Sequence, residues 1–269
     1  MSELLATTRR TVSLRDIPLV FIAPRRLFAR VEDVPAWSWP LLLLLTAVTL
    51  VGYAMVETGL IDQQVDRRVS ARIAAAEVMR HDVVERSALR EQIERELKQG
   101  RFEKLLTRIQ VIVAEPAKAL GGLLLVSALL YGLVALMGRK PEWHTVLTVC
   151  VFAGFVDLLR LLTQLALMLH FSTLDVHTSL APVAAQVTSL ATNPVALAAL
   201  SGALLAVDPF RIWFWWIMLV GLSTTAQLPR RQAWAFCLLG WLSGAAVHAG
   251  LAAATAQAAL AAHATGPPT

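Results

Sequence analysis

Long apolar stretches alternate with polar segments along this chain of 269 residues. Five of the apolar stretches come near the length of about 20 residues with which a helix crosses a bilayer. They cover residues 38–56, 118–137, 145–169, 209–227 and 233–254. A shorter apolar run, 194–207, ends at Asp208-Pro209 and fits a re-entrant helix, an interfacial helix or an outer half of the fourth span. The pattern predicts an all-α, polytopic membrane helix bundle with about five transmembrane helices, four of them within 118–254.

The segment between the first two spans, residues 57–117, has a different pattern, with apolar side chains on one face of charged helices. Two apolar stripes at helical spacing are the candidate contact residues of this charged arm. They are Val65, Val69, Ile73, Leu89, Ile93 and Leu97. Leu105 and Ile109 continue the pattern, and Gly100 and Pro116 are predicted helix stops. We expect two or three helices outside the membrane.

Two interpretations of these stripes stay open. The arm helices either pack on each other as a hairpin with a solvated outer face, or they present an apolar face to the helices of another protein. Both can hold for different faces of the arm. Acidic and basic residues are nearly balanced there, with no basic block, which argues against nucleic acid as a partner.

The composition decides the class of protein. Hydrophobic residues make up 57% of the chain and charged residues only 16%, and the mean hydropathy of +0.60 lies far on the apolar side of an ordinary soluble domain. The first residues carry arginines but no apolar core that ends in a small-residue cleavage site, so we expect no cleaved signal peptide. Cys150 and Cys237 lie in apolar spans without C-x-x-C spacing, which argues against a disulfide framework or a metal cage.

Outside the charged arm, whose length lets it translocate largely regardless of charge, basic residues are concentrated in three segments that the order of the spans puts on one side of the membrane. They are Arg9, Arg10, Arg15, Arg25, Arg26 and Arg30 before the first span, Arg139 and Lys140 after the second, and Arg230 and Arg231 after the fourth. The connection 171–193 and the tail 255–269 contain no Lys or Arg. The positive-inside rule therefore predicts that the segment 1–37 is cytoplasmic and that the arm and the C-terminus lie outside. Residues 24–33 would form an amphipathic stub at the cytoplasmic membrane face.

Tryptophans mark the predicted membrane boundaries. Seven of them are candidate interfacial anchors, because indole rings concentrate at the level of the lipid headgroups. They are Trp37, Trp39, Trp143 and Trp234 at the cytoplasmic boundary and Trp213, Trp215 and Trp216 near the outer one. The adjacent Phe214, Trp215 and Trp216 also fit the wall of a ligand pocket, and this alternative stays open.

One predicted span contains an unexpected pair of charges. Asp157 and Arg160 lie near the middle of 145–169, where an ionised side chain costs roughly 2.5–3.5 kcal/mol on insertion scales and usually faces a protein interior. Three residues apart on a helix, the two side chains can reach each other. Three roles stay open: a structural pair, a site for a charged substrate or a conformational switch, and exposure to an aqueous cavity.

Three segments carry a resemblance to a known family. PRRLFARVEDVPAWSWPLLLLL (24–45) places a basic, aromatic stub before a Trp-Pro entry into the first span. YGLVALMGRKPEWHTVLTVCVFAG (131–154) contains a Gly-basic turn between two spans, and DPFRIWFWWIMLVGLS (208–223) opens the closing section. In these segments the chain resembles the bacterial members of the Yip1 family of multi-pass membrane proteins. The resemblance implies five spans and a cytoplasmic N-terminus, although the long charged arm and the pair Asp157 and Arg160 depart from the usual family pattern.

The family resemblance also suggests a function. Some bacterial relatives are associated with ABC-type exporters as accessory membrane subunits, whereas eukaryotic relatives are associated with small GTPases and vesicle traffic. The leading hypothesis is therefore a non-enzymatic protein of the bacterial inner membrane that acts through membrane protein partners, as an accessory or scaffold subunit of an exporter or envelope complex. We expect no cofactor, and self-association into a homo-oligomer stays open.

Catalytic and metal-binding motifs offer little support for an enzyme. The sequence contains no H-E-x-x-H, Walker A, G-x-S-x-G or G-x-G-x-x-G motif. Ser243 and His248 suggest a hydroxyl beside a base, but small residues at helix interfaces explain this segment better. His170, Asp175 and His177 have no evident fourth ligand and fit the water interface better than a metal site.

Two rival hypotheses stay open beside the accessory function. A small transporter or channel would be organised around Asp157 and Arg160, because ionisable residues inside a membrane commonly mark transport pathways. A membrane-shaping protein would act through its amphipathic helices.

Overall fold

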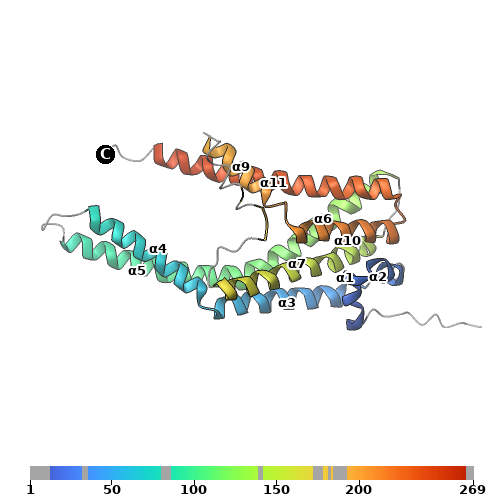
Figure 1. Cartoon of the computed structure of the whole chain (residues 1–269), viewed down its shortest axis with the longest axis horizontal. Coiled ribbons are helices and arrows are strands. Elements are labelled where there is room, and N and C mark those ends of the chain that lie inside the picture. Colours follow the sequence, from blue (N-terminus) through green and yellow to red (C-terminus); the bar gives the residue numbers. More distant parts are fainter. Residues whose placement is uncertain are drawn as a thin grey trace, which may run out of the picture. The chain divides into compact units, whose positions relative to one another are not determined.

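The computed structural model describes residues 13–31, 36–79, 86–138, 142–171, 178–180, 183 and 193–264. All regular elements within these ranges are helices (Figure 1). Contacts among the helices divide the chain into two units. The first unit comprises residues 1–44, 121–160 and 177–269, and the second comprises residues 45–120 and 161–176.

Four described helices are long and apolar enough to cross a bilayer, by their length and composition. They are Ser38–Glu57, Ile93–Leu136, Trp143–Phe171 and Arg230–Ala261. Two further helices, α9 (Pro194–Leu204) and α10 (Pro209–Thr225), pass the same test together and are bent by 52° where they meet. They make a fifth span if the pair is one broken span. The prediction of an all-α, polytopic bundle with about five transmembrane helices is confirmed.

The core of the first unit is the first half of α7 (Trp143–Phe171). Every residue from Thr145 to Val156 is buried, as expected of a helix that is apolar all round and surrounded by other helices. Among the helices that contact this half within the unit are α2 (Pro24–Val31), the first half of α3 (Ser38–Glu57), α6 (Glu115–Leu136) through Leu123, and α10.

Glycines bring these helices close together. A Cβ atom at Gly154 of α7 would lie 2.8 Å from Leu44 Cδ2 of α3. A Cβ atom at Gly221 of α10 would lie only 2.3 Å from Val149 Cγ1 of α7. Distances below 3.0 Å leave no room for a side chain, so the helix spacing at both points depends on glycine.

The segment before the first span is helical as well. Short helices η1 (Leu14–Asp16) and α1 (Pro18–Ile22) precede α2, and Arg30 of α2 donates a 2.8 Å hydrogen bond to Asp16. The stub helix α2 is amphipathic, because it buries its apolar side chains and exposes its arginines. Its Phe28 meets Phe152 of α7 edge to face, with ring centroids 6.4 Å apart.

The short apolar helix α9 packs along the last helix, α11 (Arg230–Ala264), in the same unit (Figure 1). Again a glycine lies at the contact, because a Cβ atom at Gly202 would lie 2.5 Å from the backbone oxygen of His248. Trp241 of α11 donates a 3.0 Å hydrogen bond from Nε1 to the carbonyl oxygen of Ala206, at the break between α9 and α10. The bent pair of α9 and α10 is therefore joined to α11 by close packing and by a hydrogen bond.

The second unit contains a helical hairpin of α4 (Leu60–Met79) and α5 (Arg86–Ile109), which lie side by side (Figure 1). The chain leaves α3 through a turn in which Gly59 adopts a φ of 69°, a conformation that favours glycine. The Thr58 hydroxyl stabilises this turn, since it donates to the Met55 carbonyl at 2.7 Å and accepts from the Leu60 N–H at 3.3 Å.

Both helix stops predicted in the arm are wrong. Gly100 lies inside α5, where a Cβ atom would lie 2.7 Å from Val69 Cγ2 of α4, so this glycine serves close packing and not helix termination. Pro116 lies in the first turn of α6, and the helix reaches it through five residues of π-helix, Gln110–Ala114 (η3). Proline lacks an N–H and crowds the preceding turn, and a wider π turn relieves that conflict without ending the helix.

Candidate functional site

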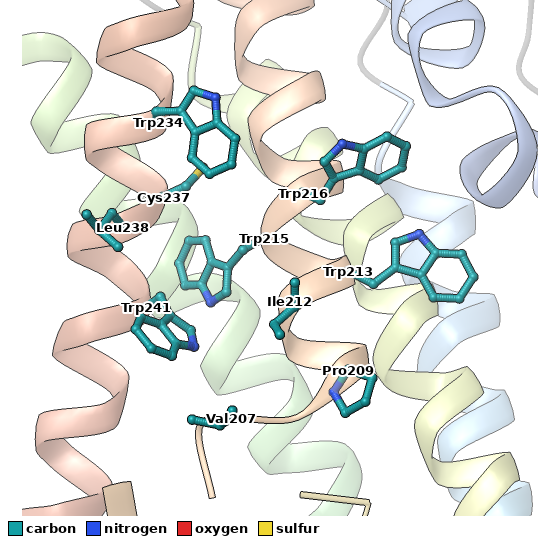
Figure 2. Close-up of a pocket in the computed structure, with 10 residues that line it drawn as sticks. All are labelled: Val207, Pro209, Ile212, Trp213, Trp215, Trp216, Trp234, Cys237, Leu238 and Trp241. Atoms are coloured by element: carbon teal, nitrogen blue, oxygen red, sulfur yellow. The ribbon is translucent and has the colours of Figure 1, made fainter. Parts of the chain in front are cut away.

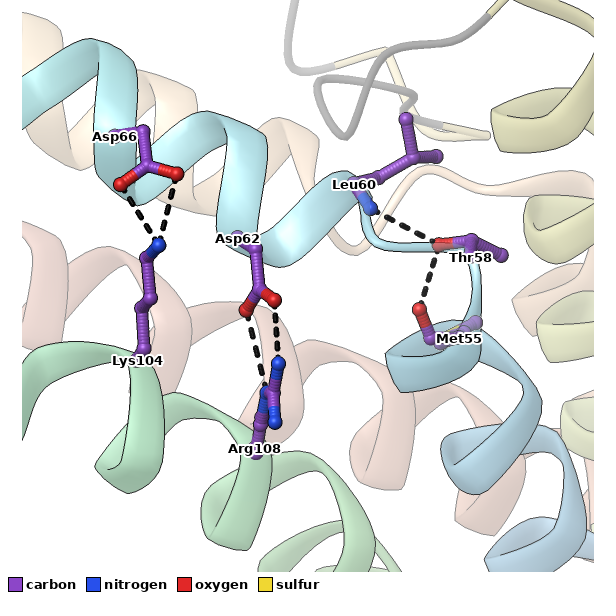
Figure 3. Close-up of polar contacts among 7 residues, drawn as sticks. All are labelled: Met55, Thr58, Leu60, Asp62, Asp66, Lys104 and Arg108. Atoms are coloured by element: carbon purple, nitrogen blue, oxygen red, sulfur yellow. Dashed lines mark hydrogen bonds and ion pairs between the residues drawn. The ribbon is translucent and has the colours of Figure 1, made fainter. Parts of the chain in front are cut away.

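The hairpin of α4 and α5 is held together by ion pairs between its two helices (Figure 3). Lys104 Nζ lies 2.7 Å from Asp66 Oδ1. One helical turn along α5, Arg108 forms a two-pronged bond to Asp62, with its Nε 3.2 Å from Oδ1. Bidentate arginine–carboxylate pairs fix geometry better than single contacts do, so these two pairs set the register between the helices.

A second group of charges continues this series toward the tip of the hairpin. Arg72 of α4 lies with its Nη1 3.7 Å from Glu96 Oε2 and its Nη2 3.5 Å from Glu103 Oε2. Arg68 Nη1 lies 3.6 Å from Glu103 Oε1. All of these side chains are at least partly exposed, so each pair contributes about 0–1 kcal/mol. Together with Asp62–Arg108 and Asp66–Lys104, they form what we call the ion-pair ladder.

The predicted apolar stripes of the arm divide between the inside and the outside of the hairpin. Val65 and Val69 are buried, and Val69 lies against Gly100 of α5, whereas Ile73 and Ile93 are half-buried and Leu97 is exposed. The side chain of Leu89 lies outside the described residues. The α4 stripe therefore joins the two helices, as the hairpin interpretation expects.

The outer face of α5 carries a second apolar stripe that was only partly predicted. Phe102, Leu105, Leu106 and Ile109 are exposed, Phe102 by 60%, and their spacing of i, i+3, i+4 and i+7 puts them on one face of the helix. Gly100 faces α4, and a 100° turn per residue puts this stripe on the opposite side. We call these four residues the outer stripe.

The charge pair of the third span is formed within α7. Arg160 Nε lies 3.4 Å from Asp157 Oδ1, and the side chains are 25% and 37% exposed, respectively. The pair directly follows the fully buried stretch that ends at Val156. A single bond of this length uses little of the hydrogen-bonding capacity of the two side chains, so the pair can still bind a further polar group.

Asp208 is a buried carboxylate that sequence reasoning overlooked, because it was assigned only to the end of the short run 194–207. The residue is 3% exposed and lies at the break between α9 and α10. Its carboxylate accepts a 2.8 Å bond from the N–H of Phe210 as the N-cap of α10, and a second bond from the hydroxyl of Thr178. The Asp-Pro pair before an apolar helix was the available signal, since Asp at the N-cap and Pro at the first position start helices.

Five tryptophans line one cavity between α10 and α11 (Figure 2). The cavity has a volume of about 570 Å³, within the range of small-molecule sites. Its wall consists of Val207, Pro209, Ile212, Trp213, Trp215, Trp216, Trp234, Cys237, Leu238 and Trp241. Trp215 packs directly on α11, because a Cβ atom at Gly240 would lie 2.3 Å from its ring. We call this space the tryptophan cavity.

The predicted anchors are thus placed in different surroundings. Trp213, Trp215, Trp216 and Trp234 line the tryptophan cavity together with Trp241, which was not predicted as an anchor. The remaining three lie elsewhere. Trp37 and Trp39 are half-buried at the start of α3, and the ring of Trp143 meets that of Tyr131 edge to face, with ring centroids 5.6 Å apart. The alternative that the Phe-Trp-Trp segment lines a pocket therefore has structural support for its two tryptophans.

Within the described part of the chain, no three His, Cys, Asp or Glu side chains are grouped so that they could hold a metal. His170 lies in the last turn of α7, whereas Asp175 and His177 lie outside the described residues. The Ser243 hydroxyl donates a 2.9 Å bond to the Gly240 carbonyl of its own helix, a common arrangement for serine in an apolar helix.

Comparison with known proteins identifies one family. The family model described as the Yip1 domain matches residues 19–254 of the chain. This range includes the stub helix α2, the hairpin, α7 with its charge pair and the tryptophan cavity. No curated protein and no solved structure gives a significant match.

Proposed function

This chain belongs to the Yip1 domain family, and from that membership we propose that it is a non-enzymatic accessory or scaffold subunit that acts through membrane protein partners. An ABC-type exporter or an envelope complex of the bacterial inner membrane is the proposed assembly. The apolar helices and the family together make the chain a multi-pass membrane protein, so its partners meet it in or beside a bilayer.

The outer stripe of the hairpin is the observation that carries this proposal. Its four apolar side chains are exposed on a helix whose other side is held by the ion-pair ladder and by the contact of Gly100 with Val69. Spacing of i, i+3, i+4 and i+7 is the pattern with which a helix enters an apolar groove of another protein. A preformed hairpin also loses little conformational freedom when it binds.

The proposed orientation puts the hairpin outside the cytoplasm. The arginines before α3 and at the start of α11 support a cytoplasmic N-terminus, and the connection 171–193 and the tail 255–269, which lack Lys and Arg, support an outside location of the C-terminus. In this orientation the arm 57–117 meets the periplasmic part of a partner, as an envelope complex requires.

Site-directed photocrosslinking in native membranes tests the partner proposal. A photoreactive residue at position 102 or 106, on the outer stripe, is expected to form one discrete adduct that mass spectrometry identifies as a membrane protein. The matched control is position 90 or 101, where exposed Arg90 and Arg101 lie on another face of the same helix. The variant F102S/L106S should lose partner recovery, whereas R90S/R101S should keep it. Adducts only with lipid at positions 102 and 106 would contradict the proposal.

The charge pair in α7 favours a second candidate, a small transporter or channel. Asp157 is 37% exposed and its bond to Arg160 is long, so both groups can exchange partners during transport. Replacement of both residues by leucine should leave partner crosslinking intact under the accessory function. If the double leucine variant no longer transports a cargo, while its crosslinking and folding are unchanged, the transporter would be favoured.

A further inference from the structure

A second pocket adjoins the tryptophan cavity and differs from it in chemistry. It has a volume of about 940 Å³ and lies between the stub helix α2, the end of α10 and the start of α11. Arg25, Arg26 and Arg230 line it, together with the hydroxyl groups of Ser223 and Thr224. We call this space the basic pocket.

Trp216 belongs to the walls of both spaces, so the two are neighbours on α10. The tryptophan cavity extends from Trp216 back to Pro209, a distance of about 10 Å along the helix, and the basic pocket extends from Trp216 forward to Thr224, about 12 Å. A polar, cationic half and an apolar, aromatic half thus follow each other along one helix.

The three arginines of the basic pocket have no carboxylate partner among the residues that the structure describes, whereas the nearby Arg30 is bonded to Asp16. The hydroxyls of Ser223 and Thr224 both donate to the Val220 carbonyl. The hydrogen-bond donors that remain for a ligand are therefore the three guanidinium groups, whose planar geometry matches phosphate oxygens.

We propose that the basic pocket and the tryptophan cavity together bind one anionic phospholipid. The phosphate lies against Arg25, Arg26 and Arg230, and one acyl chain passes Trp216 into the tryptophan cavity. The order of the two halves matches a lipid, because the headgroup remains at the membrane surface while the chain runs along a membrane helix. A soluble phosphate compound would use only the basic pocket and would leave five indole rings around an apolar space with no role.

Two further arguments support an anionic lipid over a neutral one. Three arginines without a carboxylate partner among the described residues attract a headgroup of net negative charge more strongly than a zwitterionic one. The proposed orientation puts this end of α10 at the cytoplasmic face, where anionic lipids give the membrane its negative surface potential.

Quenching of tryptophan fluorescence by brominated lipids tests the proposal on the full chain reconstituted in phosphatidylcholine vesicles. Phosphatidylglycerol with brominated acyl chains should reach half of its maximal quenching at a mole fraction about five- to tenfold lower than brominated phosphatidylcholine. The variant R26Q/R230Q should remove most of this preference. The variant R15Q/R231Q, which removes two exposed arginines of the same region that line neither pocket, should retain it.

A second variant keeps the arginines and alters the apolar half. I212F/L238F narrows the tryptophan cavity and should lower the maximal quenching by brominated phosphatidylglycerol without a change in the arginine side chains. Equal quenching of the unchanged protein by both lipids would overturn the proposal, as would a preference that R26Q/R230Q retains. A preference that inorganic phosphate removes but chloride at the same ionic strength does not would assign the pocket to free phosphate instead.

Discussion

The helix contacts around α7 and the hairpin of α4 and α5 are assembled by different physical means. Around α7, helices meet where Gly154 and Gly221 leave space for the apolar side chain of a neighbour. In the hairpin, exposed ion pairs align two helices along their length. Steric contacts of this kind tolerate almost no added volume, whereas a ladder of exposed pairs tolerates the loss of any single pair.

This difference also separates the two surfaces for which we propose ligands. The tryptophan cavity is a space left between closely packed helices, so its shape depends on the packing of α10 with α7 and α11. The outer stripe lies on the exposed side of the hairpin and depends only on the helix itself. A lipid site is therefore expected in the tightly packed unit and a protein contact on the charged arm.

The largest expected effect is at Gly221. Gly221→Val adds a branched side chain where even a Cβ atom would lie 2.3 Å from Val149 Cγ1, and valine in a helix has little freedom to rotate away. We expect a loss of about 3 kcal/mol of stability, read as a fall in the unfolding temperature of the purified protein in detergent. Gly244→Val is the matched control, because nothing lies within 4 Å of a Cβ atom there. Equal falls for the two variants would refute steric packing at Gly221.

The corresponding change in the hairpin should have a smaller effect. Gly100→Ala puts a methyl group 2.7 Å from Val69 Cγ2, but two exposed helices can shift apart more easily than a packed core can. We expect a net destabilisation of about 1 kcal/mol, confined to the hairpin and visible as faster hydrogen exchange in α4 and α5. Gln99→Ala, at an exposed neighbouring position, should leave the exchange unchanged. Faster exchange around α7 in Gly100→Ala would contradict the local effect.

Trp241 offers a third comparison, in which one polar bond is removed from a packed contact. Trp241→Phe removes the hydrogen bond from Nε1 to the Ala206 carbonyl and should cost about 0.5–1.5 kcal/mol. The measurement is again the unfolding temperature in detergent. Trp234→Phe is the control, because this ring is exposed. A larger effect of Trp234→Phe would show that the bond to Ala206 contributes little.

The smallest effect is expected for one pair of the ion-pair ladder. A double-mutant cycle of Asp66→Asn and Lys104→Gln should give a coupling energy below about 1 kcal/mol, because both side chains contact solvent. The coupling should decrease further at high salt, since salt screens exposed charges. A coupling of several kcal/mol that does not respond to salt would indicate a buried network in place of a solvated ladder.

The sequence alone determined the helical class and the approximate number of spans, because a bilayer requires long apolar helices whatever their neighbours are. It also indicated the hairpin, since Val65 and Val69 recur at helical spacing. It failed at Gly100 and Pro116, where local propensity predicts a stop. Packing against α4 and a π-helical turn override that propensity.

Only the tertiary structure decided which polar and aromatic side chains come together. In the sequence, Asp208 only marked the end of an apolar run, but in the structure it is buried at a helix break and bonded to Thr178. Arg26 and Arg230 are distant in sequence, yet they line one pocket that also contains Trp216. Hydropathy measures the environment of each helix separately, whereas a pocket depends on how helices cross, and here single glycines at the contacts determine those crossings.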